Sequence, residues 1–155
     1  MLGQSGRLET TPRSYVVDAS VVSKWFNKGE EFEEEADTLR EAWATGGVEL
    51  FSPSLMLFEV ANSIWKNPNT PNDVARALVK AAVSISPNLV TPRARVVGMA
   101  MSVARKESIT FYDAVYLALA KSLSARLITA DQKQLLASGR YVKSIHISQL
   151  PEVRL

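Results

Sequence analysis

The chain has 155 residues, of which 46% are hydrophobic, with no cysteine and a formal net charge of +2. This length suits one domain, which can bury roughly 70% of the surface of its unfolded chain without a disulfide or a structural metal. The lack of cysteine excludes thiolate zinc sites and a cysteine nucleophile and favours a reducing compartment, so we expect a cytoplasmic protein.

The first segment of the chain is polar and contains no apolar core of a secretory signal. We interpret residues 1–13 as a loose extension, or a remnant of expression, and place the domain at residues 14–155. No apolar run approaches the roughly 20 residues that cross a bilayer, so we expect no contact with a membrane.

Short apolar strands alternate with helices along the domain. We predict strands at 15–17, 48–52, 89–92, 126–130 and 145–147. We predict helices at 18–26, 30–45, 52–67, 71–85, 93–107, 110–124 and 131–139. Because the strands are continuous apolar runs, the pattern indicates a parallel sheet covered on both faces, in a single α/β domain with three layers.

Four acidic side chains are expected at one edge of this sheet. Asp18 follows the first predicted strand and Asp131 follows the fourth, and ligands of such folds bind at the carboxyl ends of the strands. Asp113 is near the start of a helix that leads back into the sheet. Glu59 lies one to two turns inside the helix that follows the second strand.

Each of these acids also has a purely structural interpretation. Asp18 and Asp131 suit helix N-caps, and Asp113 follows Thr110 by three residues, as in a capping box. Glu59 has no capping role, and its alternative is a solvated helix face. The polar residues that would share this face are Asn62, Ser63 and Lys66.

Other chemistries lack the motifs that they require. The GQSG near the N-terminus has neither the spacing nor the context of a hydrolase nucleophile elbow, and no glycine-rich nucleotide-binding motif occurs. A phosphatase that forms an aspartyl-phosphate would need a carboxylate where Ser20 stands. The single histidine, His146, lies inside a predicted strand and is interpreted as structural.

Four blocks of the sequence carry a resemblance to a known family: VVDAS at 16–20, FEVANSIW at 58–65, TFYDAVYLALA at 110–120 and LITADQKQL at 127–135. In order and spacing they resemble the PIN-domain family, and most closely the VapC-type toxin ribonucleases of prokaryotic toxin–antitoxin pairs. The resemblance covers about residues 14 to 147. It implies a parallel five-stranded sheet with helices on both faces.

The resemblance also implies an activity and a set of site residues. The activity is that of an endoribonuclease that hydrolyses RNA with Mg²⁺ or Mn²⁺, often as a homodimer that an antitoxin protein holds inactive. The acid positions of the family match Asp18, Glu59, Asp113 and Asp131, with Ser20 and Thr129 in support. Carboxylate ligands without Cys or His favour Mg²⁺ or Mn²⁺ over zinc.

From these matches we expect different roles for the four acids. Asp18 and Asp113 would be the principal metal ligands. Glu59 would be a further ligand or would orient the attacking water, and Asp131 would support a second metal site or a metal-bound water. The products would carry a 5′-phosphate and a 3′-hydroxyl.

Two features fall outside the family pattern, namely residues 1–13 and the acidic run 30–35. The segment 30–44 holds seven acids and one base, so the rest of the chain carries a charge of +8. That charge suits an anionic partner such as nucleic acid, although ordinary surface scatter explains it equally well. We interpret the acidic run as a solvated face; repulsion of RNA and docking of a basic partner are alternatives.

The sequence leaves other questions open. The sequence does not settle whether the chain forms the homodimer that the resemblance implies, although the apolar residues of 31–45 and 53–66, with Trp25, Trp43 and Trp65, exceed what one core explains. An inactive PIN-like binding or scaffold module remains an alternative function. A further alternative is a metal-dependent nuclease of DNA, or of RNA processing without an antitoxin.

Candidate phosphate contacts are basic residues scattered over the chain. They are Lys24, Lys28, Lys66, Arg93, Arg95, Arg105, Lys106 and Lys133. Each of them alone is better explained as an ordinary surface base.

Overall fold

The computed structural model describes residues 13–152 and 155, and its five strands form one parallel sheet in the order β3-β2-β1-β4-β5. The strands are β1 (Arg13–Val17), β2 (Val48–Pro53), β3 (Asn88–Val90), β4 (Arg126–Thr129) and β5 (Ser144–His146). All four neighbouring pairs are parallel. The predicted parallel five-stranded sheet is therefore confirmed.

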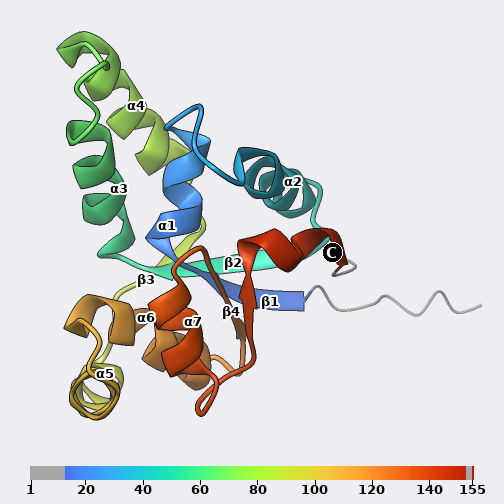
Figure 1. Cartoon of the computed structure of the whole chain (residues 1–155), viewed down its shortest axis with the longest axis vertical. Helices are drawn as coiled ribbons and strands as arrows, with labels where there is room; N and C mark the ends of the chain where they lie inside the picture. Colours follow the sequence, from blue (N-terminus) through green and yellow to red (C-terminus); the bar gives the residue numbers. More distant parts are fainter. Residues whose placement is uncertain (1–12, 153–154) are drawn as a thin grey trace, which may run out of the picture.

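Helices cover both faces of the sheet, as the three-layer prediction requires (Figure 1). On one side lie α1 (Ala19–Val22), the 3₁₀ helix η1 (Ser23–Trp25), α2 (Glu33–Ala44), α3 (Met56–Trp65) and α4 (Asn72–Ser84). On the other side lie α5 (Ala94–Glu107), α6 (Phe111–Ser122) and α7 (Gln132–Ser138). A second 3₁₀ helix, η2 (Ile147–Glu152), packs against α2. None of the helices in the described ranges is long and apolar enough to span a membrane.

Several element boundaries differ from the sequence prediction, among them the start of α3 and the start of β1. The helix expected at 52–67 begins only at Met56, because Pro53 ends β2, where it pairs with Val90 of β3. A proline at the end of a strand leaves the interior hydrogen bonds of the ladder intact. At the N-terminus, β1 already includes Arg13, and the rest of the predicted extension lies outside the described residues.

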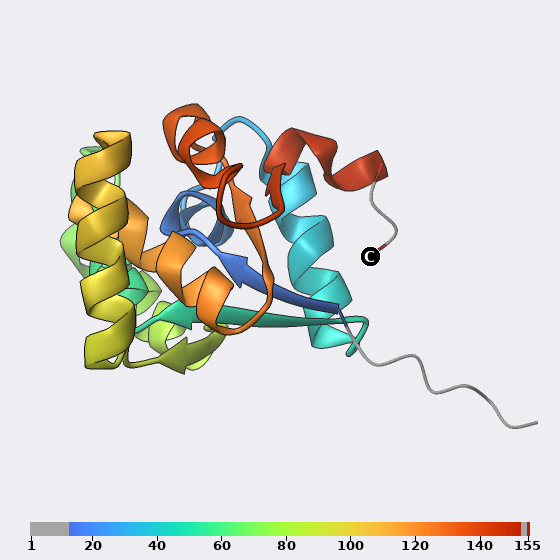
Figure 2. The same ribbon diagram turned by 90° about the horizontal axis from the view of Figure 1, so that it is seen from below.

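The buried middle of α6 explains the continuous apolar run in the sequence. Every residue from Ala114 to Ala120 is buried, because α6 packs on β1, β2 and β4 on one side and on α5 on the other. Figure 2 shows α5 standing beside α6 at the end of the sheet to which the strand arrows point. Burial on all sides fixes α6, and with it the position of Asp113 in its first turn.

The packing of the tryptophans shows whether the chain has more apolar side chains than one core can bury. The Trp25 ring stacks on Trp43 at 5.9 Å between centroids, and its indole Nε1 donates to the Ala36 carbonyl oxygen at 2.8 Å. Trp25 and Trp43 therefore pack against each other within one chain. Trp65, in contrast, is 78% exposed at the end of α3.

The turn after α2 requires a glycine, and this gives a stability prediction. Gly46 has φ +80°, a left-handed conformation that a Cβ disfavours, although the space around it is open. We expect Gly46→Ala to lower the free energy of unfolding by about 1 kcal/mol. The matched control is Gly98→Ala in the middle of α5, which also meets open space and should raise the free energy of unfolding by about 0.5–1 kcal/mol. Urea unfolding of both variants checks the opposite signs, and equal effects would contradict this account.

Candidate active site

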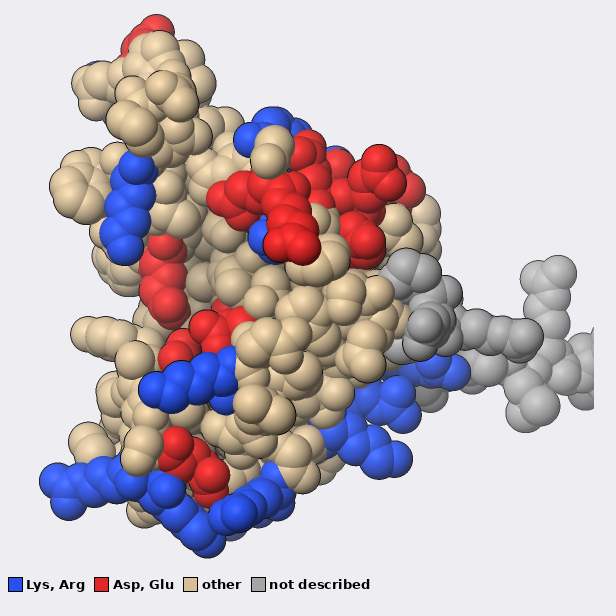
Figure 3. Space-filling model, viewed as in Figure 1, with Lys and Arg blue, Asp and Glu red and all other residues tan. Residues whose placement is uncertain are grey.

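The predicted acids lie at the carboxyl ends of the strands. Asp18 follows β1 and Asp131 comes two residues after the end of β4, and these two strands are hydrogen-bonded neighbours. Asp113 is in the first turn of α6 and Glu59 in the first turn of α3. The start of α6 lies at this edge because α6 runs antiparallel to the strands that it covers, and the start of α3 lies there because α3 directly follows the carboxyl end of β2. In the space-filling view, acidic atoms are visible between the α3–α4 part of the molecule and the α5 part (Figure 3).

Asp18 is the most deeply buried of the four acids. It is the N-cap of α1, where its Oδ2 accepts a hydrogen bond from the Ser20 backbone N–H at 3.0 Å. Its other carboxylate oxygen, Oδ1, accepts from the side-chain amide of Gln134 at 3.2 Å. The capping prediction is confirmed, but capping uses only one of the two oxygens, so it does not exhaust what Asp18 can do.

The loop that carries Asp131 is held by the two supporting residues. The Ser20 hydroxyl accepts from the Ala130 N–H at 3.0 Å, and the buried Thr129 hydroxyl accepts from the Asp131 N–H at 3.0 Å. Asp131 itself caps α7 through a 2.8 Å bond from the Gln134 N–H. Ser20 and Thr129 thus act on the backbone, and they fix where the exposed Asp131 carboxylate lies.

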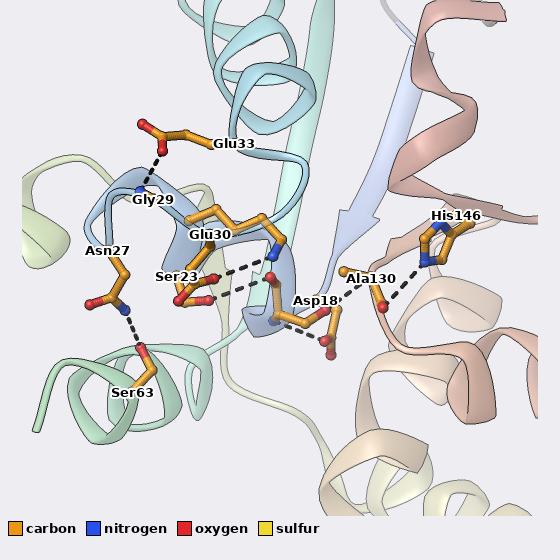
Figure 4. A network of polar contacts seen from close by, with 11 residues as sticks. Asp18, Ser23, Asn27, Gly29, Glu30, Glu33, Ser63, Ala130 and His146 are labelled. Carbon is orange, nitrogen blue, oxygen red and sulfur yellow. Dashed lines mark hydrogen bonds and ion pairs between the residues drawn. The ribbon is translucent and has the colours of Figure 1, made fainter. Parts of the chain in front are cut away.

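His146 supports the same loop from the last strand. Its Nε2 lies 3.2 Å from the Ala130 carbonyl oxygen, and its Nδ1 lies 2.7 Å from the Ser148 hydroxyl (Figure 4). Because a carbonyl oxygen only accepts, Nε2 carries the proton and Nδ1 accepts from Ser148. The structural interpretation of His146 therefore agrees with its contacts.

Asp113 and Thr110 begin α6 together. The Thr110 hydroxyl accepts from the Asp113 backbone N–H at 3.1 Å, so Thr110 is the N-cap. Burial raises the pKa of the half-buried Asp113 carboxyl, and repulsion from Asp131 adds to this. The Thr110 hydroxyl and the charge of Lys133 lower it again. Lys133 is the one candidate phosphate contact whose charge acts on this carboxyl.

Glu59 does not lie on a solvated helix face. Its Oε1 accepts a hydrogen bond from the hydroxyl of the buried Tyr116 at 2.9 Å. Burial, together with the charges of Asp18 and Asp113, raises its pKa to about 7, against an ordinary value of 4.5. Ser63, which the alternative placed on the same solvated face, instead accepts a bond from Asn27 of the loop after η1 at 3.0 Å (Figure 4).

The four carboxylates are linked by mutual repulsion. Asp18 interacts with Asp113, Glu59 with both of these, and Asp113 with Asp131. The pKa values of Asp18, Glu59 and Asp113 are all raised, and burial is the largest cause in each case, ahead of repulsion between like charges.

Sequence reasoning missed Gln134, which joins two of the acids. This residue is fully buried, and its Nε2 donates to Asp18 Oδ1 and to the Asp113 carbonyl oxygen, each at 3.2 Å. Because both partners only accept, the orientation of the amide is fixed and its Oε1 has no hydrogen-bond partner. The available signal was its register on α7, since Ala137 and Ser138, three and four residues later, are also buried.

The donor set suits a hard divalent cation. Among the described residues, no three Asp, Glu or His side chains are already grouped as ligands of one ion. The carboxylates are nevertheless close enough to raise one another's pKa, which a cation would reverse. Carboxylate oxygens, with the unpartnered Gln134 Oε1 beside them, are ligands that Mg²⁺ and Mn²⁺ accept.

Comparison with known proteins shows the family of the chain. The profile of the PIN domain family matches residues 15–138. The chain belongs to the PIN domain family. Its match includes all four acids, so the resemblance seen in the four sequence blocks is confirmed.

The relatives of this PIN domain include a ribonuclease and solved structures with the same fold. Ribonuclease VapC3 of Pyrobaculum aerophilum is 29% identical over 122 residues, which cover 76% of this chain and 89% of the relative. The crystal structure of PAE2754 from the same organism superposes with a TM-score of 0.63 at 24% identity, over 91% of this chain and 97% of that one. A toxin–antitoxin complex from Klebsiella pneumoniae contains a chain with a TM-score of 0.59 at 19% identity, over 78% of this chain and 89% of that one. The solved structures thus share the fold.

Proposed function

We propose that this PIN domain is an endoribonuclease dependent on Mg²⁺ or Mn²⁺ and the toxin of a toxin–antitoxin pair. The observation that carries the proposal is the coupled set of Asp18, Glu59, Asp113 and Asp131 at the carboxyl edge of the sheet. Three of these carboxyls have raised pKa values, which is typical of groups that work in catalysis or ion binding. The relative VapC3 is a ribonuclease, which supports RNA as the substrate.

The residues would divide the work as follows. Asp18 and Asp113 would hold the ion, and Asp131 would extend the ligand set on the exposed side. A divalent cation bound there would offset the charge of the phosphate and lower the pKa of a bound water. Glu59, whose pKa is about 7, is suited to take a proton from the attacking water near neutral pH, with its Oε1 held by Tyr116.

The proposal includes an antitoxin and a second copy of the chain. The Klebsiella pneumoniae neighbour was solved as a toxin–antitoxin complex, which supports a protein partner of this kind. Phe58 and Trp65 on α3 are each 78% exposed, and Trp65 borders a hollow of about 340 Å³ between α3 and α4. Apolar groups of this size on the surface favour an interface with protein.

The decisive experiment is a cleavage assay on the purified full-length chain. Single-stranded RNA should be cut in the presence of Mg²⁺ or Mn²⁺, should stay intact with chelator, and should give products with a 5′-phosphate and a 3′-hydroxyl. Single-stranded DNA of the same sequence serves as the control substrate. RNA left intact under every condition would favour the inactive binding module, and preferential cleavage of DNA would favour the other alternative.

Gln134 gives a prediction about positioning within the site. Gln134→Leu removes the two hydrogen bonds that the amide donates to Asp18 and to the Asp113 carbonyl. It puts an apolar side chain of similar length in place of the amide. We expect cleavage to fall about tenfold and the Mn²⁺ concentration for half-maximal activity to rise, as for other outer supports of metal ligands. The matched control is Gln132→Leu, an exposed position on the same helix, which should leave both quantities unchanged. A variant with normal metal dependence would contradict the positioning role.

A further inference from the structure

A basic hollow lies at the end of the sheet opposite to the acids. It is formed where β4 and β5 begin, has a volume of about 670 Å³, and is lined by Arg126 and by the segment 139–145. A second hollow of about 380 Å³ adjoins it and shares Arg126 and Lys143 with it, and it reaches the C-terminal end of α6 at Lys121. The two form one continuous concave surface, here named the basic hollow.

Four cations line the basic hollow and no acid does, among the described residues. They come from three separate segments and are Lys121, Arg126, Arg140 and Lys143. Arg126 and Lys143 form no ion pair with any described acid, and both are exposed.

The other two cations are held in place by Tyr141 and Glu107. The ammonium of Lys121 lies 5.7 Å from the centre of the Tyr141 ring, and the Tyr141 hydroxyl donates to Glu107 at 2.8 Å. Glu107 also pairs with Arg140 at 3.7 Å, but the Arg140 side chain is 73% exposed, so this pair is weak. In the last turn of α6, the carbonyls of Leu119, Ala120 and Lys121 accept hydrogen bonds from the N–H groups of residues 123 to 125.

We propose that the basic hollow is a second binding site of the chain for the phosphate groups of single-stranded RNA. The inference rests on the proposed function. It adds a place, away from the acids, at which the substrate is bound. The walls present cations, Gly139 and the hydroxyl residues Ser124 and Ser144, which suits phosphate oxygens more than an apolar peptide. Arg126 and Thr129 are separated by about 10 Å along β4, and because β4 is buried, an RNA that contacts both the hollow and the acids would have to pass over the surface of the molecule.

The test measures binding of a fluorescent single-stranded RNA of random sequence to the full-length chain with chelator, so that no cleavage occurs. The double variant Arg126→Gln with Lys143→Gln should bind RNA more weakly, by about threefold to fivefold for each of the two removed charges. The slope of log affinity against log salt should shrink by about 0.7 for each phosphate that is no longer neutralised. The matched control is Arg76→Gln with Lys80→Gln on α4, which removes the same charge elsewhere and should bind like the unmodified chain.

Three further outcomes decide the proposal. Glu107→Gln frees Arg140 but can still accept from Tyr141, so it should bind RNA more tightly; unchanged or weaker binding would count against the proposal. Displacement of the RNA by uridine monophosphate at equal phosphate concentration would overturn it in favour of a site for isolated phosphate. Equal RNA affinity of both double variants would also overturn it, while metal-dependent cleavage by the unmodified chain would leave the proposed function intact.

A measurement of thermal unfolding controls for loss of the fold in the variants. Thermal unfolding of each double variant should match that of the unmodified chain, because the substituted side chains are exposed. If the variant of Arg126 and Lys143 is less stable, the single variants Arg126→Gln and Lys143→Gln carry the test, each with half of the expected change in the salt slope.

Discussion

Asp113→Asn is expected to abolish RNA cleavage, with a fall of about a hundredfold or more, as for the removal of one essential charged group from a catalytic centre. Asparagine keeps the size of the side chain but cannot supply the negative charge that a divalent cation requires. The fold should survive, because the bond to Thr110 comes from the backbone N–H of residue 113. A neutral side chain there also removes the repulsion with Asp18, Glu59 and Asp131.

The control for this variant is Asp73→Asn. Asp73 is an exposed acid in the first turn of α4, so it undergoes the same chemical change at the same kind of helix position, outside the site. Cleavage by this control should equal that of the unmodified chain, and circular dichroism should show both variants folded. Full cleavage by Asp113→Asn would contradict the assignment of Asp113 as a metal ligand.

The second large effect concerns pH and metal, and it can be measured without RNA. The pKa of Glu59 is about 7 in the folded chain, against an ordinary value of 4.5. A raised carboxyl pKa gives stability that is fully present below pH 4.5 and is lost as the pH rises through 7. With chelator, we expect the free energy of unfolding to fall by about 2 kcal/mol between about pH 5 and pH 8, after a discount for solvent screening of a partly exposed group.

A divalent cation should reverse this loss. Mg²⁺ or Mn²⁺ binds the ionised carboxylates, so its addition should stabilise the fold more at about pH 8 than at about pH 5. The matched variant is Glu59→Gln, which keeps an oxygen to accept the Tyr116 bond and should flatten the pH dependence. Urea unfolding at the two pH values, with and without metal, measures all of this. Equal stabilisation by metal at both pH values would argue against ion binding by these carboxylates.

The alternation of strands and helices could be predicted because the local patterns agree with the fold. The apolar run at 15–17 becomes the buried part of β1, and Gly46 ends α2 as expected from its position after the last helical turn. The prediction was wrong at Pro53, which looks like a helix start in the sequence and is the last residue of β2. The deciding factor was its pairing with Val90, which no local pattern reveals.

The acids of the site could be predicted, but their partners could not. Asp18 and Asp131 follow strands, and a strand end in a parallel sheet is a place where function is expected. The hydrogen bond from Tyr116 to Glu59 joins residues 57 positions apart, and that from Gln134 to Asp18 joins residues 116 positions apart. Contacts of this range depend on how α3, α6 and α7 meet, which the order of residues alone does not specify.

The cations of the basic hollow were missed for a similar reason. In the sequence each of them is an isolated base between apolar or small residues, and none was among the expected phosphate contacts. Only the parallel pairing of β4 with β5 brings Arg126 next to the segment before Ser144. Conversely Lys24, which was among them, is buried and pairs with Glu30 at 3.3 Å.

The completely buried middle of α6 has a mechanical consequence. Asp113 lies near one end of this helix and Lys121 near the other, eight residues and about 12 Å apart along its axis. Seven successive buried residues between them leave no hinge, so the helix behaves as a stiff spacer. If RNA is anchored at Lys121, the distance between the anchored phosphate and Asp113 is therefore set by the length of α6 and does not change with the RNA that is bound.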